Sequence, residues 1–445
     1  MTTRRDFLVT AGVAGLLGRA LPAAARGVGQ PTPPDAAGSN DGPLPDSPLA
    51  GHPEDVARDE RYWRRVASRY RVSRRPINLE AGYFGVMATP VLNAFRRNAD
   101  RVNREGSVFA RREYATYLDA ARRRTASFIG AEPGEVAFSR NATEALQALI
   151  GQYRLLKAGD AVMYADLDYG SMQLAMNALA AREGAEVVRI ELPEPASRES
   201  VIDTYQAALR RNPHTRLLLL THTNNKTGLV HPVREVTELA RARGVDVIVD
   251  AAHSFGHMPL TVDDLGADFI GFNLHKWIGA PVGIGAFYIR GSRLDAIGNA
   301  HGDETPEQRI DGRIHTGTTN FALMMTVPAA FDFQESIGIP QKAARLRYLR
   351  DRWVSAVRDV PGVDILTPDE AGMACAITSF RLHGRGSRED NAALARALLD
   401  EFDVFTVQRN GLARGDCIRV TPAIFTMPAE VDRIAEAIRS LASRG

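Results

Sequence analysis

Short apolar runs alternate with longer helical patterns through the middle of the chain, and this alternation constrains the fold more than any other feature. The runs Leu217–Leu220 and Val245–Val249 are almost continuously apolar, as expected of strands that are covered on both faces. We therefore predict an α/β fold, a three-layer sandwich around a mostly parallel, mixed sheet. The predicted strands are Val136–Ser139, Ala161–Tyr164, Val187–Ile190, Leu217–Thr221, Val245–Asp250, Phe269–Phe272 and Gly285–Ile289, and the predicted helices are Ala142–Tyr153, Met172–Arg182, Tyr205–Arg210 and Val233–Arg243.

The pattern changes after about Phe321, where a long helical region over residues 327–357 leads into a smaller α+β domain. Its strand candidates are Ala374–Leu382, Phe405–Gln408 and Cys417–Thr421, with helices near Asn391–Phe402 and from Ala429 onward. With 445 residues and 44% hydrophobic content, the chain can build two cores. We expect an N-terminal helical segment over residues 53–75, a large domain over 76–320 and a small C-terminal domain over 321–445.

The first residues have the features of an export signal. Thr3–Leu8 contains the pair Arg4 and Arg5, a short apolar stretch follows, and Ala23–Ala25 offers a small-residue cleavage site. We predict a twin-arginine signal peptide over residues 1–25, a flexible Pro- and Gly-rich linker over 26–52, and a periplasmic or extracytoplasmic location. The alternative is a cytoplasmic tail with two chance arginines. The mature chain has no apolar run that could span a membrane, so we expect no stable membrane insertion.

The composition limits which partners and which kinds of site the chain can have. The 55 basic and 53 acidic residues give a net charge of +2, which offers no argument for a nucleic-acid partner. Only four basic residues are lysines: Lys157, Lys226, Lys276 and Lys342. The two cysteines, Cys375 and Cys417, have no metal-ligand spacing, so no metal site is predicted, and whether they pair with each other stays open.

Polar residues follow three of the predicted strands, at the sheet edge where ligands bind in open α/β folds. Asp250 ends one strand, Lys276 closely follows the next, and Thr221–Asn225 follows a third. A lysine that can form an imine, with a carboxylate to hold a pyridine nitrogen, is what pyridoxal 5'-phosphate (PLP) requires. Each residue also has an ordinary interpretation, since Asp250 could cap a helix and Lys276 could be a surface lysine.

A phosphate site is predicted where a strand passes into a helix. Ser139–Glu144 supplies backbone N–H groups at a helix N-terminus, which suit an anion. This segment could also serve only as a helix cap. The segments Asn141–Glu144, Asp250–His253 and Asn273–Trp277 occur in this order along the chain, and their combination favours a PLP site over the ordinary interpretations.

These three motifs resemble the class V aminotransferase family of fold-type I PLP enzymes, and together with Tyr83–Gly85 they are most similar to its isopenicillin N epimerase-like members. The resemblance extends from about Asn78 to Ser440. It implies a PLP-binding large domain, a homodimer, and a small amino-acid or peptide substrate.

The resemblance also implies a role for each matching residue. Lys276 would carry the cofactor and act as the base, Asp250 would hold the pyridine nitrogen, and Tyr169 would stack on the ring. The other cofactor-binding residues would be Asn141, Ala142, Thr143, Asn225, His253, Asn273 and His275, with Thr318 reaching the phosphate from the neighbouring subunit. Arg419 would bind the substrate carboxylate, and Tyr83 and Phe84 would complete the substrate site.

The resemblance leaves the reaction open. Desulfurases place a cysteine in the loop before that arginine, and residues 408–415 contain none, so a cysteine desulfurase-like lyase is disfavoured. Epimerisation and transamination both need Lys276 and Asp250, and the sequence does not separate them. Two further alternatives are an exported enzyme that tailors a secreted peptide or siderophore, and a protein that binds PLP without catalysis.

Overall fold

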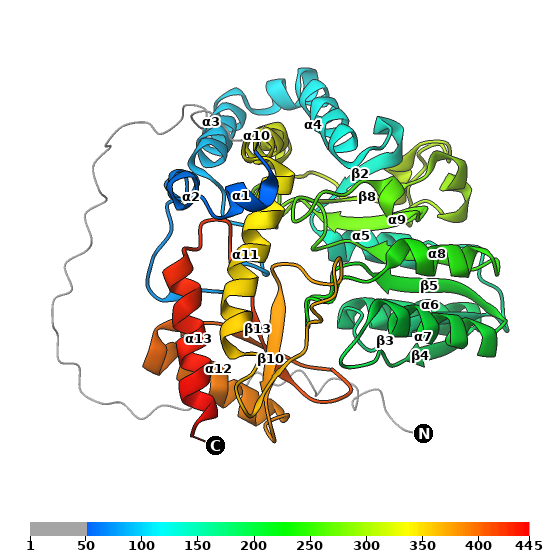
Figure 1. Ribbon diagram of the computed structural model, residues 1–445. Coiled ribbons are helices and arrows are strands. Elements are labelled where there is room, and N and C mark those ends of the chain that lie inside the picture. The colour runs from blue at the N-terminus through cyan, green and yellow to red at the C-terminus, as the bar shows by residue number, and fades with distance from the viewer. Residues whose placement is uncertain (1–50, 445) are drawn as a thin grey trace, which may run out of the picture. The chain divides into compact units, whose positions relative to one another are not determined.

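The computed structural model describes residues 51–444. Its large sheet has seven strands in the order β2-β8-β7-β6-β5-β3-β4 and lies on the right of Figure 1. β8 alone runs in the opposite direction to the other strands of this sheet, so the predicted mostly parallel, mixed sheet is confirmed. The strands are β2 (Val136–Ser139), β3 (Ala161–Ala165), β4 (Glu186–Ile190), β5 (Thr215–Thr221), β6 (Asp246–Asp250), β7 (Phe269–Asn273) and β8 (Gly285–Ile289). The predicted signal peptide and all but the last two residues of the predicted linker lie outside the described residues.

Helices cover both faces of this sheet. The strand residues that point to one face and those that point to the other are both apolar, so each face needs a covering layer. Leu217 and Leu219 of β5 belong to the core under α5 and α6, whereas Leu218 and Leu220 belong to the core on the opposite face. The predicted three-layer sandwich is therefore confirmed. The covering helices are α5 (Ala142–Gly151) and α6 (Gly170–Glu183) on one face, and α7 (Arg198–Arg211), α8 (Val233–Arg241) and the short α9 (Val262–Leu265) on the other.

Three helices that pack together lie at the top of Figure 1. They are α3 (Thr89–Arg112), α4 (Tyr114–Ile129) and α10 (Phe321–Ile337). The helical region predicted over 327–357 is confirmed, and a break divides it between two helices. That region contains the end of α10 and all of α11 (Ile339–Val357), and Gly338 between them has φ 86°, a conformation that ends a right-handed helix.

The C-terminal part forms a second, antiparallel sheet with the order β12-β13-β10-β9, which confirms the smaller α+β unit. Its elements are β9 (Val363–Ile365), β10 (Thr378–Leu382), β12 (Val407–Arg409), β13 (Cys417–Val420), α12 (Arg388–Phe402) and α13 (Pro428–Ala442). The strand predicted over Phe405–Gln408 is divided in the structure. Phe405 belongs to β11 (Val404–Phe405), which pairs with β1 (Ile77–Asn78), whereas Val407 and Gln408 belong to β12, which pairs with β13.

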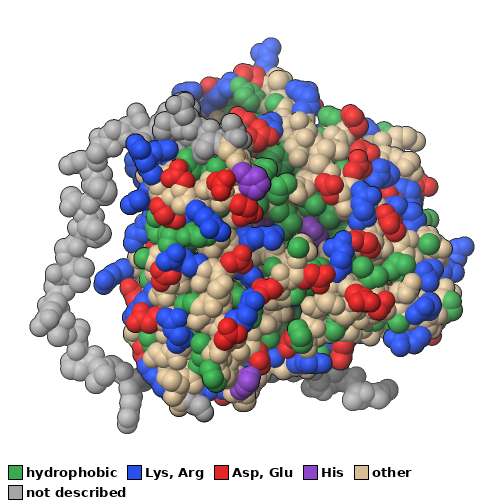
Figure 2. Space-filling model, in the orientation of Figure 1, with side chains coloured by type: hydrophobic (Ala, Val, Ile, Leu, Met, Phe, Trp, Pro, Cys, Tyr) green, Lys and Arg blue, Asp and Glu red, His purple; other side chains and the backbone are tan. Residues whose placement is uncertain are grey.

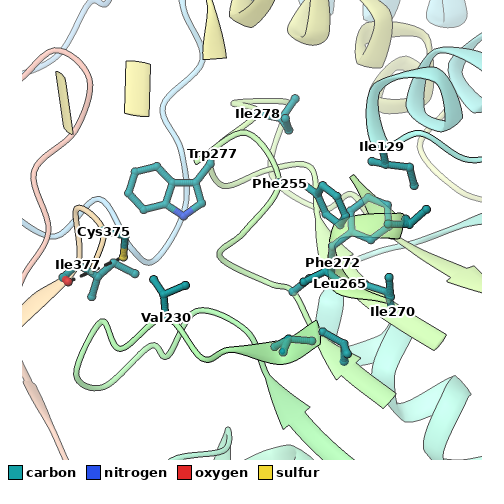
Figure 3. Packing of buried hydrophobic residues seen from close by; sticks show 14 of the residues in the cluster. Ile129, Val230, Phe255, Leu265, Ile270, Phe272, Trp277, Ile278, Cys375 and Ile377 are labelled. Atoms are coloured by element: carbon teal, nitrogen blue, oxygen red, sulfur yellow. Dashed lines mark hydrogen bonds between the residues drawn. The ribbon is translucent and has the colours of Figure 1, made fainter. Parts of the chain in front are cut away.

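The remaining elements are two short N-terminal helices and three 3-10 turns. The N-terminal helix α1 (Pro53–Ala57) packs against α11, and α2 (Glu60–Ala67) follows it. The short 3-10 turns are η2 (Pro133–Glu135), η3 (Gly291–Ala296) and η4 (Ile310–Arg313). Trp277 packs near Val230, Cys375 and Ile377, so one hydrophobic core runs from the large sheet to the C-terminal part (Figure 3). Within residues 51–444, no helix has both the length and the apolar content needed to cross a bilayer.

Candidate active site

A cavity of about 440 Å³ lies where the carboxyl ends of β5, β6 and β7 meet the N-terminus of α5 and the end of β13. This position follows from the parallel sheet, since strand ends and helix N-termini converge on one edge. Every site residue predicted from the sequence lines the cavity except Thr318: Tyr83, Phe84, Asn141, Ala142, Thr143, Tyr169, Asn225, Asp250, His253, Asn273, His275, Lys276 and Arg419.

Lys276 is the only lysine that lines this cavity, and all four lysines fall within the described part of the chain. Lys226 is buried with Nζ donating to Asp166 O at 2.7 Å, Lys342 is buried on a different cavity, and Lys157 is exposed. Burial, and next the charge of Arg419, lower the pKa of Lys276 to about 7. The amine is therefore largely deprotonated just above neutral pH, and a nucleophilic lysine needs that form.

Asp250 ends β6 and is buried at the cavity wall. Its Oδ1 accepts the Ala252 N–H at 2.9 Å, while its Oδ2 has no hydrogen-bond partner anywhere in residues 51–444. Burial raises the pKa of this carboxyl, and the Ala252 N–H and Lys276 act in the opposite direction. A carboxylate oxygen that faces the cavity and lacks a donor fits the protonated ring nitrogen of PLP.

His253 contacts Lys276 directly, with 2.9 Å between Nε2 and Lys276 Nζ. The Trp277 Nε1–H donates to His253 Nδ1 at 3.3 Å, and an indole nitrogen can only donate. Burial lowers the pKa of His253 well below its usual range, so the ring is neutral and its single proton is on Nε2. His253 is therefore a fixed donor that points into the cavity.

The N-terminus of α5 has the features of an anion site. Asn141 caps the helix by accepting the Glu144 N–H at 2.9 Å, and Asn273 Oδ1 accepts the Ala142 N–H at 2.8 Å. The Thr143 N–H has no acceptor within the described residues. A Cβ on Gly285 would lie 2.6 Å from the Asn141 carbonyl carbon, so the helix start can approach β8 only because residue 285 is glycine. These groups fit a phosphate.

His275 also lines the cavity, and its Nδ1 lies 2.8 Å from Ile284 O. Because a carbonyl oxygen only accepts, Nδ1 carries a proton there, and Nε2 could donate to an anion only if the ring were cationic. Burial lowers the pKa of His275, and the Ile284 carbonyl acts in the opposite direction. A nearby phosphate would favour the cationic form.

Two loops position Tyr169 and Asn225. Asp168 is buried, and its Oδ1 accepts both the Thr221 N–H at 2.9 Å and the Thr221 hydroxyl at 2.6 Å, which joins the loop after β3 to the end of β5. Burial raises the pKa of Asp168 to about 7. Asn224 Oδ1 accepts the Lys226 N–H at 2.8 Å and so fixes the turn that presents Asn225. Sequence reasoning did not identify Asp168.

Arg419 reaches the cavity wall but already has protein partners. Its Nη2 binds both oxygens of Glu80, and its Nη1 donates to Asn225 O at 2.8 Å. Arg409 also lines the cavity, and its Nη2 lies 3.2 Å from Glu80 Oε1. Sequence reasoning missed both Glu80 and Arg409. The one sequence feature that could have identified Glu80 is that it is an isolated charge in an apolar stretch that ends at Gly85.

Thr318 is exposed and lines a neighbouring cavity of about 570 Å³. That cavity shares Arg140, Asn141 and Gly283 with the candidate active site. Tyr83 and Phe84 line the candidate active site and are 74% and 42% exposed, so the cavity has an open, apolar mouth. Thr318 therefore lies near the N-terminus of α5 but does not line the candidate active site.

Comparison with known proteins agrees with this geometry. Residues 89–399 match the family model described as aminotransferase class-V. The chain is 30% identical over 387 residues to isopenicillin N epimerase from Amycolatopsis lactamdurans, covering 82% of this chain and 94% of that protein. It is 28% identical over 399 residues to isopenicillin N epimerase from Streptomyces clavuligerus, covering 85% of this chain and 98% of that protein.

Solved structures share the fold. An apo cysteine desulfurase from Thermococcus onnurineus NA1 superposes with a TM-score of 0.68 and 22% identity, covering 83% of this chain and 95% of that chain. A variant of C-DES with glycine covalently linked to its PLP cofactor gives a TM-score of 0.70 and 20% identity, covering 82% and 97%. The predicted fold type I is therefore confirmed.

Proposed function

Because the chain belongs to the class V aminotransferase family, we propose that it is a PLP-dependent enzyme that acts at the α-carbon or amino group of an amino acid or peptide. One observation carries the proposal: the only lysine of the cavity, Lys276, shares it with Asp250, whose Oδ2 lacks a donor in residues 51–444. The free Thr143 N–H at the start of α5 adds a place for the phosphate.

Each of several cavity residues would have a separate role in the reaction. PLP, when bound, supplies an acceptor for the electrons released at the substrate's α-carbon. Lys276 Nζ would carry the cofactor covalently and then hold or return a proton, a task suited to its pKa of about 7. Asp250 would keep the ring nitrogen protonated, and His253 would donate from Nε2 to the phenolic oxygen. Tyr169, 39% exposed at the cavity, would stack on the ring.

Epimerisation or transamination is favoured over sulfur transfer. Cys417 and Cys375 are both buried and unpaired, and burial raises the pKa of each thiol to about 12. A persulfide carrier needs an accessible thiolate. Residues 408–415, which precede β13, contain no cysteine. Neither cysteine can therefore take the part of a desulfurase nucleophile.

The proposal also covers the location of the enzyme, its substrate class and its assembly. Export of folded protein through the twin-arginine route would carry the cofactor out with the chain. An exported enzyme with an open, apolar cavity mouth formed by Tyr83 and Phe84 suits a secreted peptide or siderophore as substrate. We further propose a homodimer in which the partner subunit's Thr318 approaches the phosphate, since Thr318 stays outside the cavity of its own subunit.

The test is a titration of purified protein with a panel of amino acids and small peptides, followed by the absorption band of the bound cofactor. The proposal predicts a band that changes on adding substrate and is absent in Lys276→Ala. Lys157→Ala is the matched control, because Lys157 is exposed and outside the cavity. A stable band that no amine perturbs would instead identify a protein that binds PLP without catalysis.

A further inference from the structure

Trp277 directly follows Lys276 in the chain and connects to its amine through His253. The Trp277 Nε1–H donates to His253 Nδ1 at 3.3 Å, and the second ring nitrogen of His253, Nε2, lies 2.9 Å from Lys276 Nζ. The family resemblance implies no role for Trp277, although this residue ends one of the three motifs that carry the resemblance. The contacts place its indole N–H one residue away from the reactive amine.

Groups from three other segments hold the indole ring of Trp277. The ring of His257 stacks on it, with 3.7 Å between the ring centroids and 15° between the planes. His257 is itself fixed, because its Nδ1 lies 3.0 Å from His253 O and its Nε2 accepts the Ala376 N–H at 3.1 Å. Lys342 of α11 donates to the carbonyl oxygen of Trp277, and the indole is buried in the core drawn in Figure 3. The indole N–H therefore has one fixed direction.

The tautomer of His253 decides which form of Lys276 the cavity accommodates. Burial lowers the pKa of His253 well below its usual range, so the ring carries a single proton. Because Nδ1 accepts from the indole, that proton is on Nε2, and Nε2 donates toward Lys276 Nζ. An uncharged amine has a lone pair that accepts this N–H, whereas an ammonium group has only donors. The other tautomer would present an acceptor at Nε2 and would stabilise the ammonium form of Lys276.

We infer that Trp277 is a positioning residue, which holds His253 in the tautomer that presents a donor and no acceptor to Lys276 Nζ. The uncharged amine of Lys276, the form that can attack PLP, is thereby favoured. The same Nε2–H would donate to the phenolic oxygen of PLP after loading, and this part of the inference rests on the proposed function. The effect on Lys276 belongs to the chain before PLP is bound.

The first test determines the tautomer in the unloaded protein. Ring-15N labelling of histidine separates protonated from unprotonated ring nitrogens by chemical shift, and His253→Gln identifies the His253 signals. Wild type should carry the proton on Nε2 alone. Trp277→Phe keeps an aromatic ring against His257 but removes the indole N–H. The ratio of the two tautomers should therefore shift toward Nδ1–H by about threefold to tenfold, the effect of one neutral hydrogen bond.

The second test is the pH profile of PLP loading, followed by stopped-flow absorbance. Trp277→Phe should move the midpoint to higher pH, because the ammonium form of Lys276 is no longer opposed by a fixed donor. Loading below the midpoint should then be slower by about threefold to tenfold. The substitution removes no charge from the cavity. The charged groups that act on Lys276 are Asp250, Glu80, Arg409 and Arg419.

Trp353→Phe is the matched control, because Trp353 is fully buried and its Nε1 has no hydrogen-bond partner within residues 51–444. Its tautomer ratio and loading profile should equal those of wild type. A wild-type proton on Nδ1 of His253 would overturn the inference even if Trp277→Phe does not fold. An unchanged tautomer and midpoint in a folded Trp277→Phe would overturn it as well. Wild type that does not load PLP on Lys276 refutes the proposed function, whereas the tautomer of the unloaded protein still decides the role of Trp277.

Discussion

Asp250 has one carboxylate oxygen bound to the Ala252 N–H and the other open to the cavity. We predict that Asp250→Asn binds PLP but loses turnover, because the amide cannot keep the ring nitrogen protonated. A charge-assisted hydrogen bond contributes about 1.5–3 kcal/mol, so the rate should fall by roughly 10- to 100-fold. Steady-state kinetics together with the cofactor absorbance of the same sample measure both effects. Loss of cofactor binding without a slower loaded enzyme would contradict the assigned role.

The pKa of Lys276 predicts how loading depends on pH. The folded chain holds this pKa at about 7, below the usual value of 10.5. PLP should therefore attach to the apoprotein at a rate that rises with pH around a midpoint near 7. The unfolded chain binds the Lys276 proton more tightly than the folded chain does. The free energy of unfolding of the apoprotein therefore increases as the pH rises from about 7 toward 10.5.

Stopped-flow absorbance over pH 5–9 checks the loading rate. Denaturant unfolding of the apoprotein at several pH values checks the stability. Burial also lowers the pKa of Lys342 to about 7, so the Lys342→Met variant is needed to separate its contribution from that of Lys276. A wild-type loading rate that is still rising by about tenfold per pH unit at pH 9 would mean that the cavity does not depress the pKa of Lys276.

At the scale of secondary-structure elements, the segment after β1 supports the segment after β7. The Gly85 N–H donates to His275 O at 2.7 Å, and a Cβ on residue 85 would lie 1.9 Å from Lys276 O. Gly85→Ala must therefore move the backbone that carries Lys276. We expect a loss of about 1–3 kcal/mol in the free energy of unfolding and weaker PLP binding, measured by denaturant unfolding and cofactor titration.

Gly151→Ala is the control for this substitution. Gly151 is the last residue of α5, and an added Cβ would meet nothing within 4 Å. Alanine favours a helix by up to about 1 kcal/mol over glycine, so this variant should be as stable as wild type or slightly more stable. Equal effects of the two substitutions would show that the contact between Gly85 and Lys276 is unimportant.

The sequence predicted the elements whose signals are local. Runs such as Leu217–Leu220 identified the strands, and the polar residues after them identified Asp250 and Lys276. The pairing of Glu80 with Arg419 could not be predicted, because it joins positions 339 residues apart through the fold. The division of residues 404–409 between β11 and β12 also depends on tertiary pairing, because β11 joins a strand from the N-terminal part. The helices α3 and α4 were not predicted.

At the scale of the whole molecule, acidic and basic side chains are interspersed over the face shown in Figure 2, as expected from a net charge of +2. The candidate site is assembled from segments as far apart as Tyr83 and Arg419. PLP can therefore bind only to a folded chain, and export after folding would keep it bound.

We predict that changing Arg4 and Arg5 to lysine traps active, PLP-bound and uncleaved protein in the cytoplasm. Wild type should be found outside the cytoplasm with its cofactor, after cleavage near Ala25. Cell fractionation with cofactor absorbance on each fraction measures this. Changing Arg74 and Arg75 to lysine controls for lost arginines, because Arg74 and Arg75 lie in the folded part of the chain. Undiminished export of the Arg4 and Arg5 variant would refute the link between the signal and the loaded enzyme.

The central claim is that Lys276 carries PLP, and one measurement tests it most directly. Borohydride reduction of the purified protein fixes the cofactor to its lysine, and mass spectrometry of the digested chain then identifies the labelled residue. The account predicts a pyridoxyl label on Lys276 and its loss in Lys276→Ala, with Lys226→Arg labelled as wild type because Lys226 Nζ is held by Asp166 O. A label on Lys226, Lys342 or Lys157, or no label on a protein that shows the cofactor band, would contradict it.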